Sequence, residues 1–401
     1  MGKVTTDEDQ VLEFRRDFQR ELRGRIREAI QAVLGEELEA ALGCTRHERS
    51  EGRQGYRNGT QRREITTANG LQVLDVPRGR LWTGDGATTE FQSEVLPRYA
   101  RRTQEVDEAI LGVYLAGGNS RRIRKALEPL LGQANLSKSA ISRIVGRLKA
   151  LFAEWNERDL SSESYPIIYL DGIALKVRLA RRVVSVPVLA ILGVDQEGCK
   201  RLVALRLCVS EAETHWRGLI EDLKRRGLPA PQLVISDGHP GLTRARSAWS
   251  TSKVQRCTVH KWENLKKHCP QHAHGELKRD WTTIVRAKDG AAALDAYKGF
   301  ERKWSKLCPP VANSLVEAGT DLLTFYEFPK AMWKGLRSTN ALENLNREFR
   351  RRTKTQGSFS TEDAALTLLY GLVAFGQIKF RHVDGHRELR SMLRNLETSA
   401  A

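Results

Sequence analysis

The spacing of apolar and polar side chains predicts a long helix near the start of the chain. Between residues 8 and 42, apolar side chains recur every three or four positions, which is the period of one face of an α-helix. The recurring residues are Val11, Phe14, Phe18, Leu22, Ile26, Ile30, Val33 and Leu34. This face either packs on the rest of the same chain or pairs with a second copy of the protein.

The next segment, residues 43–102, loses the helical period and becomes rich in Gly, Arg and Thr. Apolar and polar residues alternate over 63–67 and 71–76, with the turn dipeptide Asn69-Gly70 between the two stretches. Alternation on both sides of such a turn predicts two short paired strands. We therefore predict a first region, residues 1–102, made of a helix and a small β-containing arm.

A second region, residues 103–155, returns to the helical pattern with one interruption. A helix is predicted over 121–131, Gly132 follows it, and a second helix begins after Ser137, whose hydroxyl can accept from backbone N–H groups one turn in. Two helices joined in this way are typical of a helix-turn-helix, whose second helix lies in the major groove of DNA. The same pattern is also common by chance in helical pairs that bind no DNA.

From residue 165 onward the pattern predicts a mixed sheet with helices. Strands are predicted at 166–170, 173–177, 183–194, 201–209, 232–236 and 253–259, with helices at 211–226 and 240–249. Residues 261–335 carry helical periods and four tryptophans but no convincing strand, and helices resume at 339–352 and 361–380. The predicted fold is therefore a multi-domain α+β or α/β protein, with a sheet-containing core at 156–260, a helical insertion at 261–335, and the last core helices and tail at 336–401.

Charge narrows the class of partner. The 401 residues include 66 Lys and Arg against 49 Asp and Glu, a net charge of +17, which favours a polyanion. The excess is concentrated in 119–149, with eight basic residues and one acid, and in 334–354, with seven and two. A solvated helix face usually mixes signs, so contact with DNA phosphates explains these segments better.

Membrane and secreted classes are disfavoured. The longest nearly apolar run, residues 183–194, is twelve residues long and is too short to span a bilayer, and no basic-then-apolar leader begins the chain. The six cysteines are irregularly spaced and suggest no disulfide framework. We expect a cytoplasmic protein.

Three acidic residues are candidates for the chemistry. Asp171 and Asp237 each follow a predicted buried strand, and ligands bind at the carboxyl ends of strands in open α/β sheets. Glu343 lies beside the apolar stripe of the helix at 339–352, so it can face the sheet edge. The alternatives are helix-capping roles for the aspartates and a helix ion pair between Glu343 and Arg347.

Three carboxylates from two strand ends and a later helix can hold two Mg²⁺ ions. Magnesium prefers oxygen ligands, and a pair of such ions directs in-line displacement at phosphorus. An aspartate on the first strand, another on the fourth or fifth strand and an acid on a late helix is the ribonuclease-H-like order. The predicted core is therefore ribonuclease-H-like.

Short motifs in this order resemble a known family. They are Arg57-Asn58-Gly59, Val76-Pro77-Arg78, Asp171 to Arg178, Ser236 to Leu242, Gln255 to His260 and Ser338 to Arg347. Over about residues 50–380 the chain resembles the bacterial mutator-type transposases of insertion sequences. Gly172 and Gly238 stand where that family often has Ala or another small residue, and neither change removes a ligand.

The resemblance implies a DDE transposase in which Asp171, Asp237 and Glu343 are catalytic and hold two Mg²⁺ ions, with Mn²⁺ able to substitute. It also implies that Cys257 and His260 are the family's Cys-x-x-His motif, and we expect them and Arg347 to support the active site. Nearby donors leave zinc binding open as an alternative to a hydrogen-bonded Cys–His pair. These donors are His268, Cys269, His272 and His274.

The expected partner is double-stranded DNA, as terminal inverted repeats and as target. Regions 1–102 and 103–155 and the basic helix after Glu343 are expected to hold it, through Arg121, Arg122, Lys138, Ser139, Arg143, Arg147, Arg350 and Arg351. Because strand transfer brings two DNA ends together, a homodimer or larger assembly is expected. Two rival functions share these features: a DNA-binding regulator without catalysis, and a nuclease of the same fold that cuts without joining.

Overall fold

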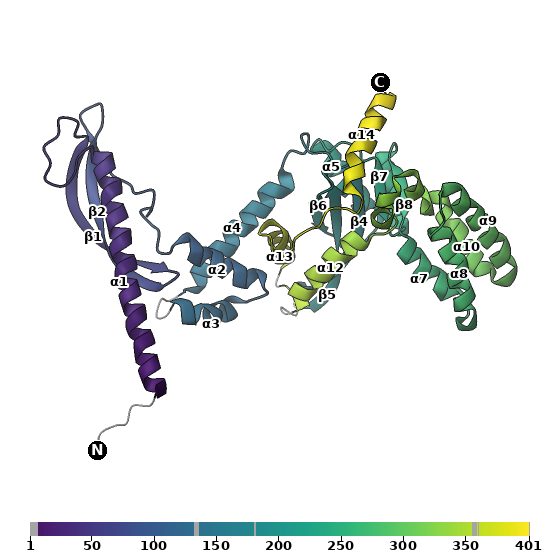
Figure 1. Ribbon diagram of the computed structural model, residues 1–401, viewed down its shortest axis with the longest axis horizontal. Coiled ribbons are helices and arrows are strands. Elements are labelled where there is room, and N and C mark those ends of the chain that lie inside the picture. The colour runs from purple at the N-terminus through teal and green to yellow at the C-terminus, as the bar shows by residue number, and fades with distance from the viewer. Residues whose placement is uncertain (1–6, 132–135, 180–181, 355–358, 360, 401) are drawn as a thin grey trace, which may run out of the picture. The chain divides into compact units, whose positions relative to one another are not determined.

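A computed structural model describes residues 7–131, 136–179, 182–354, 359 and 361–400 (Figure 1). The chain divides into two compact units, residues 1–145 and 146–401, and the division falls inside helix α4 (Lys138–Glu157). Across the described ranges, no helix combines the length and apolar character needed to cross a bilayer. The finer division into five regions stays a prediction.

In the first unit, helix α1 (Asp7–Leu42) confirms the predicted long helix. Its C-terminal half packs on the rest of the unit, with Leu34 in one cluster and Leu38 and Leu42, both fully buried, in another. Its other half leaves Phe14 and Phe18 exposed. The packing interpretation of this helix is therefore confirmed for its C-terminal half.

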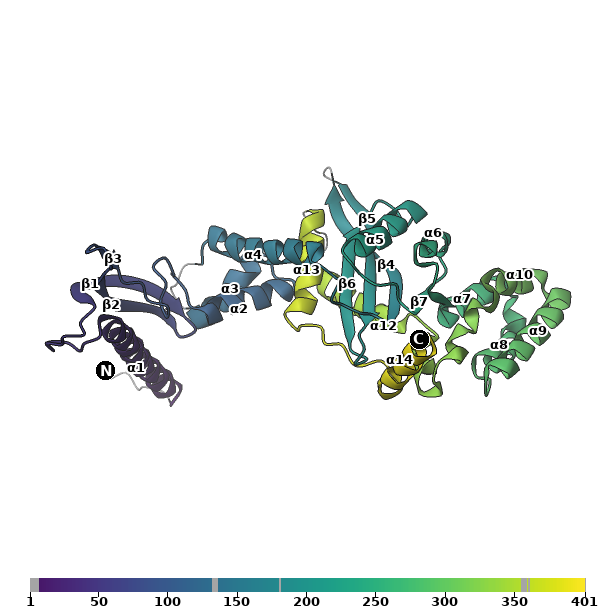
Figure 2. The ribbon, with the colours of Figure 1, turned by 90° about the horizontal axis from the view of Figure 1, so that it is seen from above.

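Helix α1 packs on a three-stranded antiparallel sheet made of β1 (Gly55–Thr67), β2 (Gly70–Trp82) and β3 (Thr88–Glu90), as Figure 2 shows. The predicted strands are confirmed and are longer than the alternation indicated. Their turn is tight: Thr67 pairs with Gly70, whose φ of 99° favours glycine.

Three helices complete the first unit: α2 (Gln104–Leu115), α3 (Ser120–Leu131) and the start of α4. They share one apolar cluster of Val106, Ile110, Ile123, Leu127, Leu131, Leu136, Ile141 and Ile144. The hydroxyl of Ser137 accepts a hydrogen bond from the Ala140 backbone N–H at 3.1 Å, which confirms the predicted cap of α4.

The second unit contains a five-stranded mixed sheet in the order β6-β5-β4-β7-β8, whose strands are all labelled in Figure 1. Its strands are β4 (Ile167–Leu179), β5 (Arg182–Val194), β6 (Lys200–Leu207), β7 (Leu233–Ser236) and β8 (Lys253–Arg256). Strands β4, β5 and β6 are antiparallel neighbours, whereas β7 and β8 continue the sheet in parallel from β4.

One strand prediction is wrong. The segments expected as separate strands at 166–170 and 173–177 form the single strand β4, which runs through Asp171. Pairing with β5 is continuous from Ile167 to Leu179 and holds the backbone extended on that side. An aspartate followed by glycine therefore did not end the strand.

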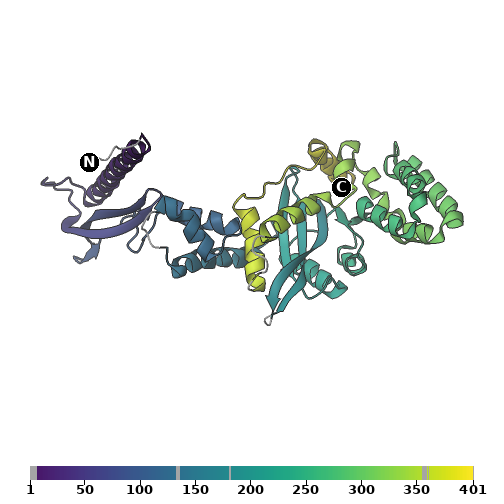
Figure 3. The same ribbon diagram turned by 90° about the horizontal axis from the view of Figure 1, so that it is seen from below.

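Helices cover the two faces of this sheet. Trp216 and Ile220 of α5 (Glu213–Arg225) pack with Ile168, Leu170 and other residues of one face. After β7 follow α6 (Pro240–Ala245) and the 3₁₀-helix η1 (Arg246–Trp249). Figure 3 shows α12 (Asn340–Thr353), in yellow-green, running along the sheet, and α13 (Glu362–Ala374) contacts β4 and β6. A last helix, α14 (His386–Ala400), was not predicted.

Residues 258–336 are helical and contain no strand, as predicted for most of this range. The elements are α7 (Thr258–His268), η2 (Gln271–Ala273), α8 (His274–Val285), α9 (Gly290–Leu307), α10 (Pro309–Ala318), η3 (Gly319–Leu322), η4 (Thr324–Glu327), η5 (Lys330–Met332) and α11 (Trp333–Leu336). The segment leaves and re-enters the core at one place, since the N–H and hydroxyl of Thr258 both donate to the Arg337 carbonyl at 2.9 Å.

Candidate active site

The register of the sheet places Asp171 and Asp237 at the same edge. Parallel pairing of β4 with β7 ends at Leu170 opposite Ser236. Asp171 is the next residue of β4, which continues beyond it, and Asp237 directly follows the last residue of β7. Asp171 Oδ1 accepts from the Gly172 N–H at 2.9 Å, and Asp237 Oδ1 accepts from the His239 N–H at 2.9 Å. Two carboxylates therefore lie where the parallel pairing of β4 with β7 ends.

Helix α12 brings further groups to this edge. Its buried residues Leu342, Leu345 and Phe349 form the predicted apolar stripe. Asn346 lies on the same helix, and its side-chain N–H donates to Asp171 Oδ2 at 2.9 Å. Glu343 lies one turn before Asn346, so α12 presents Glu343 at the aspartate-bearing edge.

Thr339 connects the start of α12 to the end of β8. Its fully buried hydroxyl lies 3.2 Å from Glu343 Oε1, 3.4 Å from Cys257 Sγ and 3.4 Å from His260 Nδ1. Its backbone N–H also donates to Cys257 Sγ at 3.4 Å. The position of Glu343 is therefore fixed by the same short segment that begins α12.

The electrostatics of the site favour a bound cation. Burial, with the nearby charge of Asp237, raises the pKa of Asp171 to about 7, although His260 and the Gly172 N–H oppose the shift. Burial also raises the pKa of Glu211. Carboxyl groups that resist ionisation because they are buried together gain most from a positive ion.

His260 is the positive group within this cluster. A hydrogen bond with Cys257 raises the pKa of His260 to about 9 against the effect of burial, and Asp237 and Glu343 add to the increase. Burial raises the pKa of Cys257, but hydrogen bonds from His260 and Thr339 outweigh this effect and lower it overall. His260 Nε2 lies 3.9 Å from Glu343 Oε1. The Cys-x-x-His motif thus places a cationic ring among the carboxylates.

Glu211, at the start of the segment that leads into α5, was not predicted as a site residue. A Cβ added to Gly172 would lie 2.5 Å from Glu211 Oε1, so the glycine leaves room for this carboxylate. Glu211 also contributes to the raised pKa of Asp171. Asn346 and Thr339 were missed as well, and no spacing or strand-end signal singles out these three residues in the sequence.

The donors at this edge fit Mg²⁺. They are carboxylate oxygens with an added amide: Asn346 Oδ1 is buried and has no hydrogen-bond partner among the described residues. Magnesium binds such oxygens. Within the described ranges, one set of three possible ligand groups has its atoms within 4.8 Å of one another, namely Cys257, His260 and Glu343. Neither aspartate joins that set at this spacing, and neither do the four additional donors considered for zinc.

The other predicted site residues lie on the surface. Arg347 is exposed and donates to Asn344 Oδ1 at 2.7 Å, so the structure does not bring it to the carboxylates, and its supporting role stays a prediction. The predicted DNA contacts in both units are also exposed and stay predictions. They are Arg121, Arg122, Lys138, Ser139, Arg143, Arg147, Arg350 and Arg351.

Comparison with known proteins identifies the class as the insertion-sequence transposases. The chain is 33% identical over 354 residues to the transposase for insertion sequence element IS406 of Burkholderia multivorans, covering 86% of this chain and 89% of that one. It is 34% identical over 361 residues to the transposase for ISRM5 of Rhizobium meliloti, covering 88% and 86%. It is 32% identical over 330 residues to the transposase for IS256 in transposon Tn4001 of Staphylococcus aureus, covering 80% and 81%.

The family model described as "Transposase, Mutator family" matches residues 3–381. The chain therefore belongs to the Mutator family of transposases. The resemblance found in the sequence motifs is confirmed.

Proposed function

We propose that the protein is a Mg²⁺-dependent DDE transposase that cuts DNA at the ends of an insertion sequence and joins those ends to target DNA. The observation that carries this proposal is the pair of aspartates that directly follow the parallel pairing of β4 with β7, beside the helix that bears Glu343. Membership in the Mutator family supports transposition as the biological process.

We further propose that the second unit contains a ribonuclease-H-like core. The support is its strand order, in which an antiparallel group of three long strands is followed by two short parallel ones. Counting only the five strands of this sheet in chain order, Asp171 is on the first, Asp237 follows the fourth, and Glu343 is on a later helix. This is the order expected of an enzyme whose chemistry depends on carboxylates at one sheet edge.

In this proposal Asp171, Asp237 and Glu343 hold two Mg²⁺ ions, and Mn²⁺ can substitute. Bound Mg²⁺ supplies the charge that favours attack at phosphorus, first by water and then by the freed DNA 3′-hydroxyl. The chain's own residues set the position and charge of the ligands. Asn346 holds Asp171 by its 2.9 Å hydrogen bond, and Thr339 holds Glu343. No side chain is required as a nucleophile.

The cationic His260 has a place in the same mechanism. In the metal-free protein its charge partly offsets the mutual repulsion of the carboxylates, as the opposing effects on the pKa of Asp171 and His260 indicate. The positive charge of His260 therefore opposes the increase in the pKa of Asp171 that burial and Asp237 cause.

Terminal inverted repeats are proposed to bind the first unit, including the helix-turn-helix residues on α3 and α4, while Arg350 and Arg351 of α12 contact flanking phosphates. Such contacts position DNA without specifying its sequence. A regulator without catalysis would use the same surface, but it would not need Asp171, Asp237 and Glu343 together.

The experiment supplies end-labelled terminal DNA, target DNA and Mg²⁺ to the wild type, to Asp237→Asn and to Asp295→Asn. Asp295 is exposed on α9 and is the matched control. We expect cut and joined products from the wild type and the control, and neither from Asp237→Asn. Equal cleavage by Asp237→Asn would refute the proposed triad. Cut ends that are never joined would favour the nuclease, and binding without cleavage would favour the regulator.

We also propose a homodimer or larger assembly. Phe14 and Phe18 of α1 are 72% and 59% exposed, and their rings stack with centroids 6.5 Å apart. This half of α1 lies outside the part that packs on the sheet, which leaves its apolar face available to a second copy. Light scattering after size-exclusion chromatography tests this: Phe14→Asp with Phe18→Asp should lower the measured mass to that of one chain. An unchanged mass would place the dimer contact elsewhere.

A further inference from the structure

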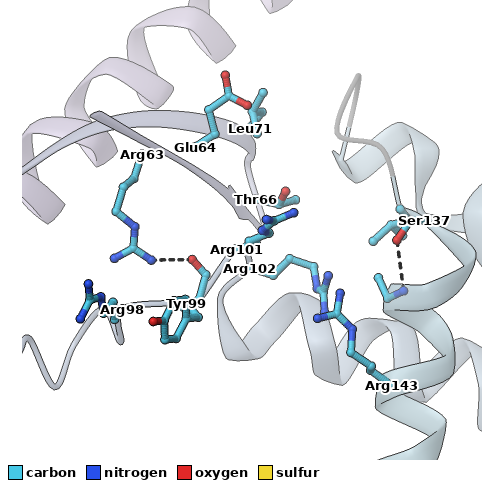
Figure 4. A pocket seen from close by; sticks show the side chains of 13 residues that line it. Arg63, Glu64, Thr66, Leu71, Arg98, Tyr99, Arg101, Arg102, Ser137 and Arg143 are labelled. Atoms are coloured by element: carbon cyan, nitrogen blue, oxygen red, sulfur yellow. Dashed lines mark hydrogen bonds between the residues drawn. The ribbon is translucent and has the colours of Figure 1, made fainter. Parts of the chain in front are cut away.

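A pocket of about 870 Å³ lies within the first unit (Figure 4). Its walls come from the end of β1, the segment after β3 and the first turns of α4. The lining residues used below are Arg63, Arg98, Tyr99, Arg101, Arg102 and Arg143. Arg143 alone was predicted from the sequence as a DNA contact.

The pocket has a strong positive charge. Five arginines line it, against one acidic residue, Glu64. Arg98 is paired with Glu90 at 3.3 Å and Arg102 with Asp107 at 2.8 Å. The other three arginines have no acidic partner among the described residues.

Those three arginines differ in what they do. Arg63 supports the pocket wall, because its guanidinium donates to the carbonyls of Pro97 at 3.0 Å and Ala100 at 2.7 Å. The shorter of these two hydrogen bonds is the dashed line from Arg63 in Figure 4. Burial lowers the pKa of Arg63, as expected for a cation without a counter-ion. Arg101 is exposed, and Arg143 makes only a long 3.4 Å bond to the Ser139 carbonyl of its own helix. Arg101 and Arg143 are therefore the charges best placed to meet an anion.

Two further features suit a nucleic-acid backbone. Tyr99, at the rim, is 85% exposed, and the Arg98 guanidinium lies 5.7 Å from its ring centroid. An exposed aromatic ring among arginines can pack on a sugar or a base while the cations hold phosphates. The N-terminus of α4 carries the positive end of the helix dipole, and its first turn contains no acidic residue that would offset this charge. The helix therefore adds to the positive potential of the pocket.

We propose that this pocket binds the sugar-phosphate backbone of the terminal DNA where the duplex passes from the three-stranded sheet to α4. Arg101 and Arg143 contact phosphates, and Tyr99 packs against an adjacent deoxyribose or base. The sheet and the helices of the first unit then hold one duplex together rather than separate ones. This inference rests on the proposed function, since the DNA is the end of the insertion sequence.

The test measures binding of the full-length protein to a labelled terminal-repeat duplex and to a scrambled duplex of equal length. EDTA is present, so that cleavage plays no part, and the salt concentration is varied. Arg101→Ala and Arg143→Ala are compared with Arg27→Ala, an exposed arginine of α1 that has no ion pair among the described residues. Thermal unfolding of each variant confirms that the unit is folded.

We expect Arg101→Ala and Arg143→Ala each to weaken binding to both duplexes by about tenfold, as for loss of one charged hydrogen bond. Each should also lower the slope of log affinity against log salt by about 0.9, the value for one phosphate contact. Arg27→Ala should match the wild type. Tyr99→Ala should weaken binding with an unchanged slope, and Tyr99→Phe should restore it.

The outcomes separate this inference from the proposed function. Wild-type slopes in both folded arginine variants would overturn the phosphate contacts and leave the catalytic proposal standing. An equal decrease in the salt slope for Arg27→Ala would show that any lost positive charge has this effect, and it would also overturn the proposal that the pocket binds DNA. Failure of the wild type to bind either duplex would overturn both proposals. Equal cleavage by Asp237→Asn and the wild type would overturn only the catalytic proposal.

Discussion

Replacing Asp171 by asparagine should stabilise the metal-free protein while abolishing its chemistry. The carboxyl group is buried at the sheet edge near Asp237, and its pKa is raised from 3.8 to about 7. Because the folded-state pKa lies above the unfolded one, protonated Asp171 contributes stability that is complete below about pH 4 and lost as the pH rises through about 7. Asparagine is neutral at every pH and does not incur that loss.

The magnitude follows from the shift. The pKa of Asp171 is higher by about three in the folded protein, and each pKa unit corresponds to about 1.36 kcal/mol. At pH 8, where Asp171 is ionised, its burial therefore lowers the free energy of unfolding by about 4 kcal/mol. Asparagine keeps one oxygen, so it cannot accept from both the Gly172 N–H and the Asn346 side chain as Asp171 does. Loss of one such bond costs about 1 kcal/mol. The net gain expected for Asp171→Asn is therefore about 3 kcal/mol at pH 8, and it should shrink toward zero by pH 5.

Thermal and urea unfolding in EDTA at pH 5, 6, 7 and 8 measures this difference, and the exposed Asp295→Asn is the control. Repeating the series with Mg²⁺ adds a second readout, because an ion that binds only the folded state stabilises it. Mg²⁺ should stabilise the wild type and have little effect on Asp171→Asn. The reasoning is refuted if Asp171→Asn is no more stable than the wild type at pH 8 in EDTA, or if its advantage is the same at pH 5.

Two further substitutions test the packing around the site. Gly238 has φ +84°, and an added Cβ would lie 2.0 Å from Arg256 Nε. Gly238→Ala should therefore destabilise the protein by about 2 kcal/mol, as measured by urea unfolding. The control is Gly299→Ala, at a helical position with open space around it, which should stabilise the protein slightly. Thr339→Val removes the hydroxyl that donates to Glu343, and it should lower the cleavage rate about tenfold at saturating DNA. Thr339→Ser keeps a hydroxyl and should restore the wild-type rate. A wild-type cleavage rate in Thr339→Val would contradict the proposal that Thr339 positions Glu343.

The secondary structure was predictable where the local pattern and the tertiary contacts agree. The long first helix, the turn at Asn69-Gly70 and the cap at Ser137 each follow from residues that are close in sequence. The continuation of β4 through Asp171 was not predictable in this way. That continuity depends on pairing with a distant strand, and an Asp-Gly dipeptide viewed alone indicates a turn.

The residues of the candidate site were likewise predictable only where the local sequence marks them. Asp171 and Asp237 were identifiable as candidates because each directly follows a run of apolar residues, and Glu343 because it lies beside an apolar stripe. Asn346, Thr339 and Glu211 carry no such mark, because what distinguishes them is a contact with a residue far away in the sequence.

The closure of the helical segment explains how Glu343 returns to the end of β8 across a long gap in sequence. The hydrogen bonds from Thr258 to the Arg337 carbonyl join the first residue of the helical segment to the residue that follows its last helix. Thr339, two residues after Arg337, then contacts Cys257, the residue before Thr258. Lys261 strengthens the exit, since its buried ammonium donates to the Ser314 carbonyl and to Glu317, both at 2.8 Å. The position of Glu343 is consequently set by the short stretch from Arg337 to Asn340 against the end of β8. Changes in α8 and α9, which lie between these contacts, should leave the acidic edge in place as long as this closure is kept.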